Sequence, residues 1–229
     1  MSLIKNIITV VFLLLIVITV PYLIYEWSEH ENLGSNEMGY VTKDTYNHYG
    51  SEQTIVLITG IHPREKLAIN PEIESAKRFA LTHNAKLVNY NVTVTKDPED
   101  YKNSRYNGEH LVSEIVLPDI YKSKADVVII SHSHIEGYGE GFYLATPAMD
   151  EASVKLAENI ERSGIDFKYF RTPENVTSYE STSIELVSKP LADSGYSTLV
   201  YEIPENITEQ DSTDKTYDLL VKTYELLNQ

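Results

Sequence analysis

The stretch TIVLITGIHPRE, residues 54–65, decides how the rest of the chain is interpreted. It begins with an apolar, mostly β-branched run at 55–59, which predicts a short buried strand. Gly60 interrupts this run, and a histidine and a carboxylate, His62 and Glu65, follow three positions apart. In open α/β sheets, ligands bind beyond the carboxyl ends of the strands. The stretch therefore predicts a strand that presents candidate metal ligands at its end.

The composition of the chain limits the chemistry that such a site can use. The 229 residues include 34 acidic and 19 basic side chains, so the formal net charge is -15. This charge argues against nucleic acid as a partner, because the phosphates would be repelled. Cysteine is absent, so a metal ion would have to bind to histidine, aspartate or glutamate.

An apolar segment near the N-terminus, residues 3–25, is typical of a membrane-spanning helix. It carries no charge between positions 7 and 24, and a spanning helix needs about 20 such residues. Lys5 lies near its start and three glutamates follow it between 26 and 31, a bias that places the N-terminus in the cytoplasm. We therefore expect a single-pass anchor within 1–27 and the rest of the chain outside the cytoplasm, at the cell membrane.

A cleaved signal peptide is the alternative for this segment. The apolar run is long for the core of a signal peptide, and residues 21–23 make a poor cleavage site. Trp27 also suits the aromatic belt of a membrane interface. Three Asn-x-Thr sequons, at Asn91, Asn175 and Asn206, would accept glycans in an extracellular protein.

The rest of the chain divides into a polar segment and one domain. Residues 28–52 are polar with scattered glycines, which predicts a linker with one possible edge strand near Tyr40. Residues 53–229 are long enough for a single domain with its own core. No internal repeat is evident in this part of the chain.

Strand-like and helix-like patterns alternate along 53–229. After the strand at 55–59, we expect strands at 87–95, 125–131, 142–146, 166–170 and 197–203. We expect helices that start at Asn70, run over 108–117 and 150–162, and follow Ser212, with loops at 96–107 and 171–183. This alternation predicts an α/β fold, a three-layer sandwich with a mostly parallel, mixed central sheet.

Three of the expected strands end in side chains that could form one site. The strand at 125–131 leads to His132 and His134, and the strand at 197–203 carries Glu202 near its end. Two histidines and a glutamate form a known catalytic zinc set with an open position for water. A further carboxylate can then act as general base, and Glu202 interrupts an apolar strand, where an acid is costly unless it has a function.

These residues resemble the zinc carboxypeptidase superfamily, which includes the succinylglutamate desuccinylase/aspartoacylase branch. The family has a His-x-x-Glu pair after a strand, matched by His62 and Glu65, and a later histidine followed by serine, matched by His132. Its catalytic glutamate lies in a strand between an aromatic and an aliphatic residue, as Glu202 does. The resemblance covers about residues 54–205.

The resemblance also implies substrate-binding residues. Arg105 lies where the family has an Asn-Arg pair that holds a substrate carboxylate, and Tyr179 is the candidate for its mobile tyrosine. His134 remains open as a substrate-binding residue, as a replacement for His132, or as a solvated side chain. Ser104 stands where the family has asparagine. The family also has a second arginine that stabilises the oxyanion, and no counterpart is evident upstream of Arg105.

The resulting prediction is a membrane-anchored, extracytoplasmic zinc amide hydrolase that acts on peptides or cell-wall peptides. Zn2+ would be held by His62, Glu65 and His132, and Glu202 would be the general base. The alternatives are a catalytically degenerate peptide-binding module of the same fold, a deacylase of N-acyl amino acids, and a purely structural surface protein.

Overall fold

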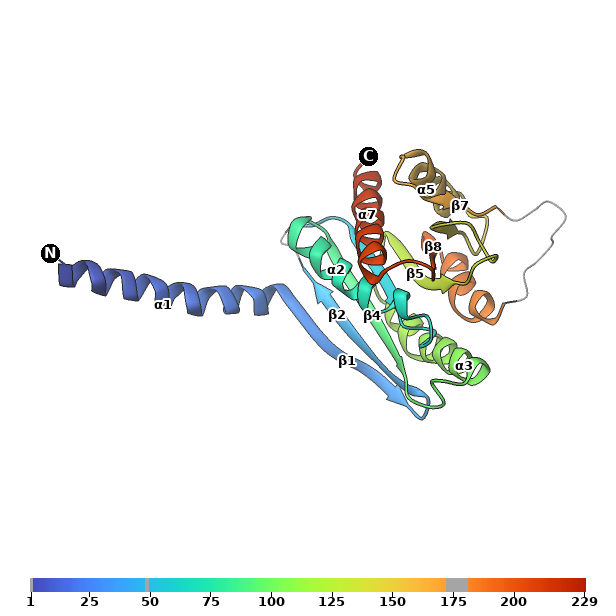
Figure 1. Cartoon of the computed structure of the whole chain (residues 1–229), viewed down its shortest axis with the longest axis horizontal. Helices are drawn as coiled ribbons and strands as arrows, with labels where there is room; N and C mark the ends of the chain where they lie inside the picture. The colour runs from blue at the N-terminus through green and yellow to red at the C-terminus, as the bar shows by residue number, and fades with distance from the viewer. Residues whose placement is uncertain (1, 48–49, 172–180) are drawn as a thin grey trace.

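The computed structural model describes residues 2–47, 50–171 and 181–229 (Figure 1). Its strands are β1 (Ser28–Asn36), β2 (Gly39–Tyr46), β3 (Thr54–Thr59), β4 (Lys86–Val94), β5 (Val127–His134), β6 (Tyr143–Ala145), β7 (Lys168–Tyr169) and β8 (Thr198–Pro204). Its α-helices are α1 (Ser2–Trp27), α2 (Asn70–Thr82), α3 (Tyr101–Leu111), α4 (Leu117–Ile120), α5 (Glu151–Arg162), α6 (Lys189–Asp193) and α7 (Glu209–Leu227). Three short non-α helical turns complete it: η1 (Lys66–Ala68), η2 (Val112–Val116) and η3 (Ile184–Ser188).

All eight strands belong to one mixed sheet, in the order β1-β2-β4-β3-β5-β8-β6-β7. The four central strands, β4, β3, β5 and β8, run parallel to one another. β1 and β2 are antiparallel at one side, and β6 is antiparallel to β8 at the other. Because the central strands are parallel, their carboxyl ends lie along one edge of the sheet.

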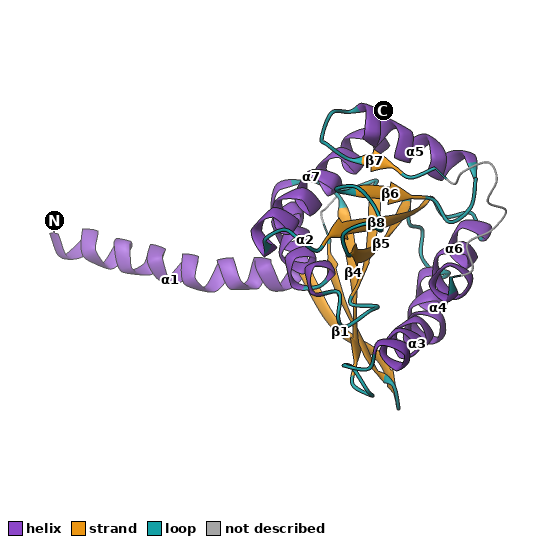
Figure 2. Ribbon diagram, turned by 45° about the vertical axis from the view of Figure 1, so that its right-hand side comes forward, coloured by secondary structure: helices purple, strands orange, loops and turns teal. Residues whose placement is uncertain are grey.

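Helices cover both faces of the sheet, which confirms the predicted three-layer sandwich (Figure 2). Side chains of β3 alternate between two cores: Ile55 and Leu57 pack with α2, α5 and α7, while Val56 and Ile58 pack with α3, α4 and α6. All four are almost fully buried. Burial on both faces explains the uninterrupted apolar run, and truncation of Leu57 to alanine would cost about 2–5 kcal/mol.

The segment predicted as a linker, 28–52, is instead largely part of the sheet. β1 and β2 form a hairpin, and β2 pairs with β4 along its whole length. β1 lies at the edge of the sheet and most of its side chains face solvent. Its sequence therefore lacks the apolar alternation by which a strand is recognised, since backbone hydrogen bonds rather than burial hold it in place.

Two other boundaries differ from the prediction because of helix caps. The expected loop at 96–107 contains the start of α3, where the side chain of Asp100 accepts a hydrogen bond from the backbone N–H of Asn103 at 2.7 Å. α7 begins at Glu209 and not after Ser212, because Thr208 and Asp211 form a capping box. The helical stretch of η3 and α6 was not predicted.

The helix α1 extends away from the sheet (Figure 1). Its large apolar side chains between Ile4 and Ile18 are exposed. Among the described residues, the structure contains no helix that meets both the length and the hydropathy needed to cross a membrane. The membrane segment stays a prediction from the sequence.

One carboxyl group lies inside the core that contains α2 and α7. Glu72, in the first turn of α2, is completely buried, and among the described residues neither of its oxygens has a hydrogen-bond partner of good geometry. Burial raises the pKa of Glu72 to about 8, and the nearby hydroxyl of Ser131 offsets this only in part. Glu72 is therefore uncharged at neutral pH.

This buried acid predicts a pH dependence of stability. The folded state holds a proton on Glu72 up to a pKa of about 8, whereas the unfolded chain releases it near the ordinary value of about 4.3. Stability should therefore fall as the pH rises between these values, by at most about 1.4 kcal/mol per pH unit. Urea unfolding of the wild type and of Glu72→Gln should diverge in slope over this window. Parallel curves would contradict the assignment.

Candidate metal centre

Two glycines allow the segments of the site to approach one another. Gly60 ends β3 with φ of 77°, and a Cβ at this position would lie 2.3 Å from the carbonyl oxygen of Val92. A Cβ at Gly108 in α3 would lie 1.7 Å from the carbonyl oxygen of Ile61. The loop after β3 therefore folds back tightly, and α3 packs directly against it.

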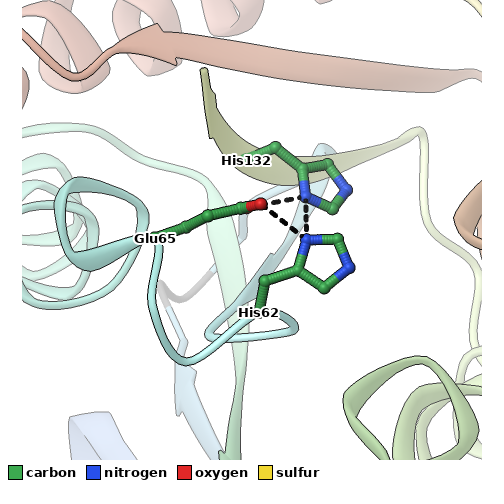
Figure 3. A group of neighbouring side chains, drawn as sticks. All are labelled: His62, Glu65 and His132. Atoms are coloured by element: carbon green, nitrogen blue, oxygen red, sulfur yellow. Dashed lines mark hydrogen bonds and ion pairs between the residues drawn. The ribbon is translucent and has the colours of Figure 1, made fainter. Parts of the chain in front are cut away.

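Three predicted ligands meet at the carboxyl edge of the sheet (Figure 3). Nδ1 of His62 lies 2.8 Å from Oε1 of Glu65, and Nδ1 of His132 lies 3.0 Å from Oε2 of the same carboxylate. The two Nδ1 atoms are 3.1 Å apart. All three side chains are buried, and one ligand atom from each lies within 4.8 Å of the others.

The donor set fits a divalent metal ion. Ligand atoms bound at about 2.0–2.1 Å to a tetrahedral zinc ion lie about 3.3–3.4 Å apart. The observed separations of 2.8, 3.0 and 3.1 Å would have to open by only a few tenths of an ångström. Two imidazole nitrogens that face each other at hydrogen-bond distance also repel unless a proton or a cation lies between them.

The carboxylate of Glu65 is the most heavily bonded group of the site. Besides the two histidines, it accepts hydrogen bonds from Nη1 of Arg105 at 2.8 Å and from the backbone N–H of Ser133 at 3.3 Å. Burial opposes its ionisation, but the charges and hydrogen bonds of His132 and His62 outweigh burial and hold the pKa of Glu65 well below its usual range. Glu65 is therefore ionised, as a metal ligand must be.

A second buried carboxylate, which the sequence did not reveal, contacts the other side of His62. Nε2 of His62 donates to Oε1 of Glu109 at 3.3 Å, and Glu109 is buried in α3. Burial disfavours the charged imidazole, but the hydrogen bonds to Glu109 and Glu65 raise the pKa of His62. Such a partner fixes the tautomer and the orientation of a histidine ligand.

The other histidine is held in a similar way. The hydroxyl of Ser183, at the start of η3, lies 3.4 Å from Nε2 of His132. Nδ1 of His132 thus remains directed toward Glu65 and His62. Both histidines therefore turn the same kind of nitrogen, Nδ1, toward the centre of the group.

Glu202 lies beside His132 because the two residues are register partners on the parallel strands β5 and β8. Register partners point to the same face of a sheet, so the carboxyl group stands next to the ligand group. Burial raises the pKa of Glu202 to about 7; the charge of Glu65 adds to this, whereas His132 and Arg105 oppose it. On its other side, Glu202 pairs in register with Tyr143 of β6.

The predicted substrate-binding residues have different outcomes. Arg105 lies at the site, but its guanidinium is bonded to Glu65. His134 is outside the ligand group, and its two ring nitrogens lie 3.3 and 3.0 Å from the carbonyl oxygens of Ile135 and Gly141. Both contacts are with the segment that follows β5, and binding of substrate by His134 stays a prediction. Tyr179 lies outside the described residues.

The sequence analysis also did not single out Arg64, which directly precedes the ligand Glu65. Arg64 is exposed, and its guanidinium lies 5.7 Å from the ring centre of Tyr101, which also contacts Arg105 at 5.5 Å. A helix assigned over α3 would have placed Tyr101, Arg105 and Glu109 on one helix face, because they follow one another at four-residue spacing. The contacts of this face with Arg64 and His62 depend on the packing of α3 against the loop after β3. The assignment of 96–107 as a loop concealed that spacing.

Solved structures share this fold. The chain matches a metallo-carboxypeptidase from Burkholderia cenocepacia over 87% of its own length and 66% of that chain, with a TM-score of 0.59 and 14% identity. For a succinylglutamate desuccinylase from a Silicibacter species the shares are 86% and 66%, the TM-score 0.51 and the identity 13%. The chain also matches the product-bound cell shape determinant protein Csd4 from Helicobacter pylori. That match covers 82% of this chain and 55% of the other, with a TM-score of 0.54 and 12% identity.

The chain therefore has the fold of the metallo-carboxypeptidases and the succinylglutamate desuccinylases, as its motifs predicted. It spans just under two thirds of the length of the first of these structures. No protein-family model and no curated protein matches the sequence. The likeness defines the fold, and the chemistry has to be argued from the site itself.

The contact between Glu109 and His62 can be tested by metal affinity. Glu109→Gln keeps the size of the side chain but removes the charge that orients His62, so we expect Zn2+ to bind about 10–100-fold more weakly. Competition with a chromophoric chelator measures this affinity. Glu114→Gln, an exposed change of the same charge nearby, is the control, and equal affinities in the two variants would contradict the role of Glu109.

Proposed function

We propose that the chain is a zinc-dependent amide hydrolase of the carboxypeptidase type that acts on peptides. The observation that carries this proposal is the juxtaposition of the ligand group His62, Glu65 and His132 with Glu202 on the neighbouring strand. Two histidines and a glutamate can hold a metal ion, and an adjacent carboxylate of raised pKa can accept a proton from water. Together these groups can perform metal-assisted hydrolysis.

Zinc is the metal that suits these donors best. Two imidazoles and one carboxylate are typical of catalytic zinc sites, and the chain offers no thiolate. When bound, zinc supplies a Lewis acid for the scissile carbonyl and lowers the pKa of water to about 7. Glu109 and Ser183 hold the two histidines so that Nδ1 of each faces the metal position.

Glu202 performs the proton transfers in this proposal. In its ionised form the carboxylate takes a proton from the attacking water, and it then delivers that proton to the nitrogen of the leaving amine. Its half-buried position excludes part of the solvent and keeps its pKa, about 7, close to neutral pH. A group with such a pKa can both accept and donate a proton at physiological pH.

Arg105 is the candidate for binding a substrate carboxylate. Its side chain is about one-third exposed, so solvent and solutes reach part of it although it contacts Glu65. A guanidinium can hold a carboxylate through two parallel hydrogen bonds. Exposed Arg64 lies next to the same tyrosine and adds positive charge to this rim.

We further propose that the domain lies outside the cytoplasm, anchored to the membrane by α1, and that its substrates are peptides or cell-wall peptides. The uncharged apolar run of α1, its exposed side chains, and the placement of Lys5 near its start support this location. One structure of the same fold is described as a cell shape determinant protein. An outside location favours peptides over metabolic N-acyl amino acids.

The ion pair between Arg105 and Glu65 occupies the group that would position a substrate for cleavage, which favours one competing function: a catalytically degenerate module of the same fold that binds peptides without cutting them. In this arrangement the guanidinium already has a carboxylate partner at 2.8 Å. A substrate would have to displace that partner before Arg105 could bind it. The two functions can be distinguished at Glu202: the hydrolase needs this residue for turnover, whereas the binding module has no turnover.

Replacement of the proposed base separates these functions. Glu202→Gln should lower kcat by about 100-fold or more, because the general base is lost, while zinc content and peptide binding remain. Release of amino acids from a mixture of short peptides measures turnover in the zinc-loaded protein, with Glu114→Gln as the control. Equal turnover in wild type and Glu202→Gln would refute the assignment of the base, and peptide binding without turnover in either protein would favour the binding module.

The same group sets the expected pH dependence. Glu202 must be ionised to accept a proton, and burial raises its pKa to about 7, so activity should fall as the pH drops. A bound cation stabilises the ionised carboxylate, so the decrease in activity should occur at a pH equal to or below the pKa of about 7. Measurement of kcat/KM between about pH 5 and about pH 9 tests this expectation. A rate that stays constant down to the acid end of this range would contradict it.

A further inference from the structure

A polar pocket lies at the end of the sheet opposite the candidate metal centre. Its volume is about 560 Å3, and its lining comes from the first residues of β3 and β4, from β1 and β2, and from the turn that follows α4. Thr54 and Lys86 are the first residues of β3 and β4, whereas His62 and Glu65 follow the carboxyl end of β3 and His132 lies near the carboxyl end of β5. Pockets of this size accommodate small ligands.

Four lysines line this pocket: Lys43, Lys86, Lys122 and Lys124. Their concentration is notable in a chain whose formal net charge is -15. Such a chain repels anions over most of its surface. A local cluster of cations is therefore the feature that would allow an anion to bind here.

The charges of these lysines are only partly compensated. Nζ of Lys43 lies 2.7 Å from Oδ2 of Asp119. For the other three lysines, the described part of the chain provides no carboxylate within ion-pair distance, and Glu29 is the acidic side chain among the lining residues. Asp126, close to Lys124 in sequence, accepts a hydrogen bond from the backbone N–H of Thr54 at 2.6 Å. Four ammonium groups thus lie around the pocket with two carboxylates, Glu29 in its lining and Asp119 beside it, and the charge of Asp119 also acts on Lys122.

The floor of the pocket is rigid and its rim is adaptable. Val56 and Tyr90, which line it from the sheet, are almost fully buried, and the hydroxyl of Tyr90 is tied to Asp119 at 2.8 Å. Lys122 and Lys124 are exposed, and their long side chains can reorient toward a ligand. Ammonium groups on flexible stems bind phosphate as point charges.

We propose that this pocket binds a phosphate-bearing anion through Lys86, Lys122 and Lys124. Its position suggests the source of that anion, because α1 ends at Trp27 and leads directly into β1 (Figure 1), and Glu29 of β1 lines the pocket. With α1 in a membrane, the pocket would face the lipid headgroups and the metal centre would point away from them. An anionic phospholipid headgroup is then the favoured ligand. That source rests on the proposed membrane anchor, whereas the anion site does not.

The test uses the full chain, labelled with 15N and held in micelles of a non-ionic detergent. Backbone signals of Lys122, Ser123 and Lys124 are followed by NMR during titration with inorganic phosphate. A second series compares micelles that contain phosphatidylglycerol with micelles that contain the same fraction of phosphatidylcholine. The double variant Lys122→Gln/Lys124→Gln removes two cations of the pocket. The control Lys77→Gln/Lys155→Gln removes two exposed lysines from α2 and α5.

We expect phosphate to cause saturable shifts at these three signals, with affinity about tenfold or more lower in the pocket variant and unchanged in the control. Saturation by phosphatidylglycerol but not by phosphatidylcholine would identify a lipid headgroup as the source. Equal responses to the two lipids, with phosphate binding intact, would support the site with a soluble phosphoester as its ligand. The absence of saturable shifts, or equal affinities in the two double variants, would overturn the proposal. None of these readouts depends on hydrolase activity.

Discussion

The carboxylate of Glu65 is the contact on which the geometry of the site depends. It interacts with His62, His132, Arg105 and the backbone of Ser133, at 2.8, 3.0, 2.8 and 3.3 Å respectively. These partners come from the loop after β3, from α3 and from β5, so one buried charge fixes how three segments meet. A buried carboxylate is tolerated only when it is fully paired. Here two of the pairing groups, His62 and His132, are themselves candidate metal ligands. The contacts that offset the cost of burying Glu65 therefore also place the three ligands as a cation requires.

The parallel centre of the sheet explains why these groups lie together. β3, β5 and β8 are adjacent and parallel, so residues that follow or end them share one edge although they are far apart in the sequence. The register of β5 with β8 places Glu202 beside His132, and the close packing at Gly108 brings Glu109 and Arg105 of α3 against the loop. The opposite edge carries the lysine-lined pocket and the junction with α1. The two ends of the central strands are thus chemically distinct. The carboxyl ends carry acidic side chains and histidines, and the opposite ends carry lysines.

Most of the fold and the ligand group could be predicted from the sequence, because buried strands and capped helices have strong local patterns. β3 gave an uninterrupted apolar run, and His62 and Glu65 follow it as expected. The strand expected at 125–131 continues to His134, so His132 lies within β5 and not after it. The hairpin of β1 and β2 could not be recognised, since an edge strand with exposed side chains is polar throughout. Glu109 was missed because its role depends on the packing of α3 against the loop after β3. The bond between Arg105 and Glu65 is likewise a tertiary contact that no sequence pattern encodes.

The central claim is that His62, Glu65 and His132 bind one zinc ion. X-ray absorption spectroscopy at the zinc edge of the purified, zinc-loaded protein tests it most directly. It should show two imidazole nitrogens at about 2.0–2.1 Å and a carboxylate oxygen at about 2.0–2.2 Å from the zinc ion, and the two-imidazole signature should be lost in His132→Ala. A protein that takes up no zinc, or a spectrum that is unchanged in His132→Ala, would contradict the claim.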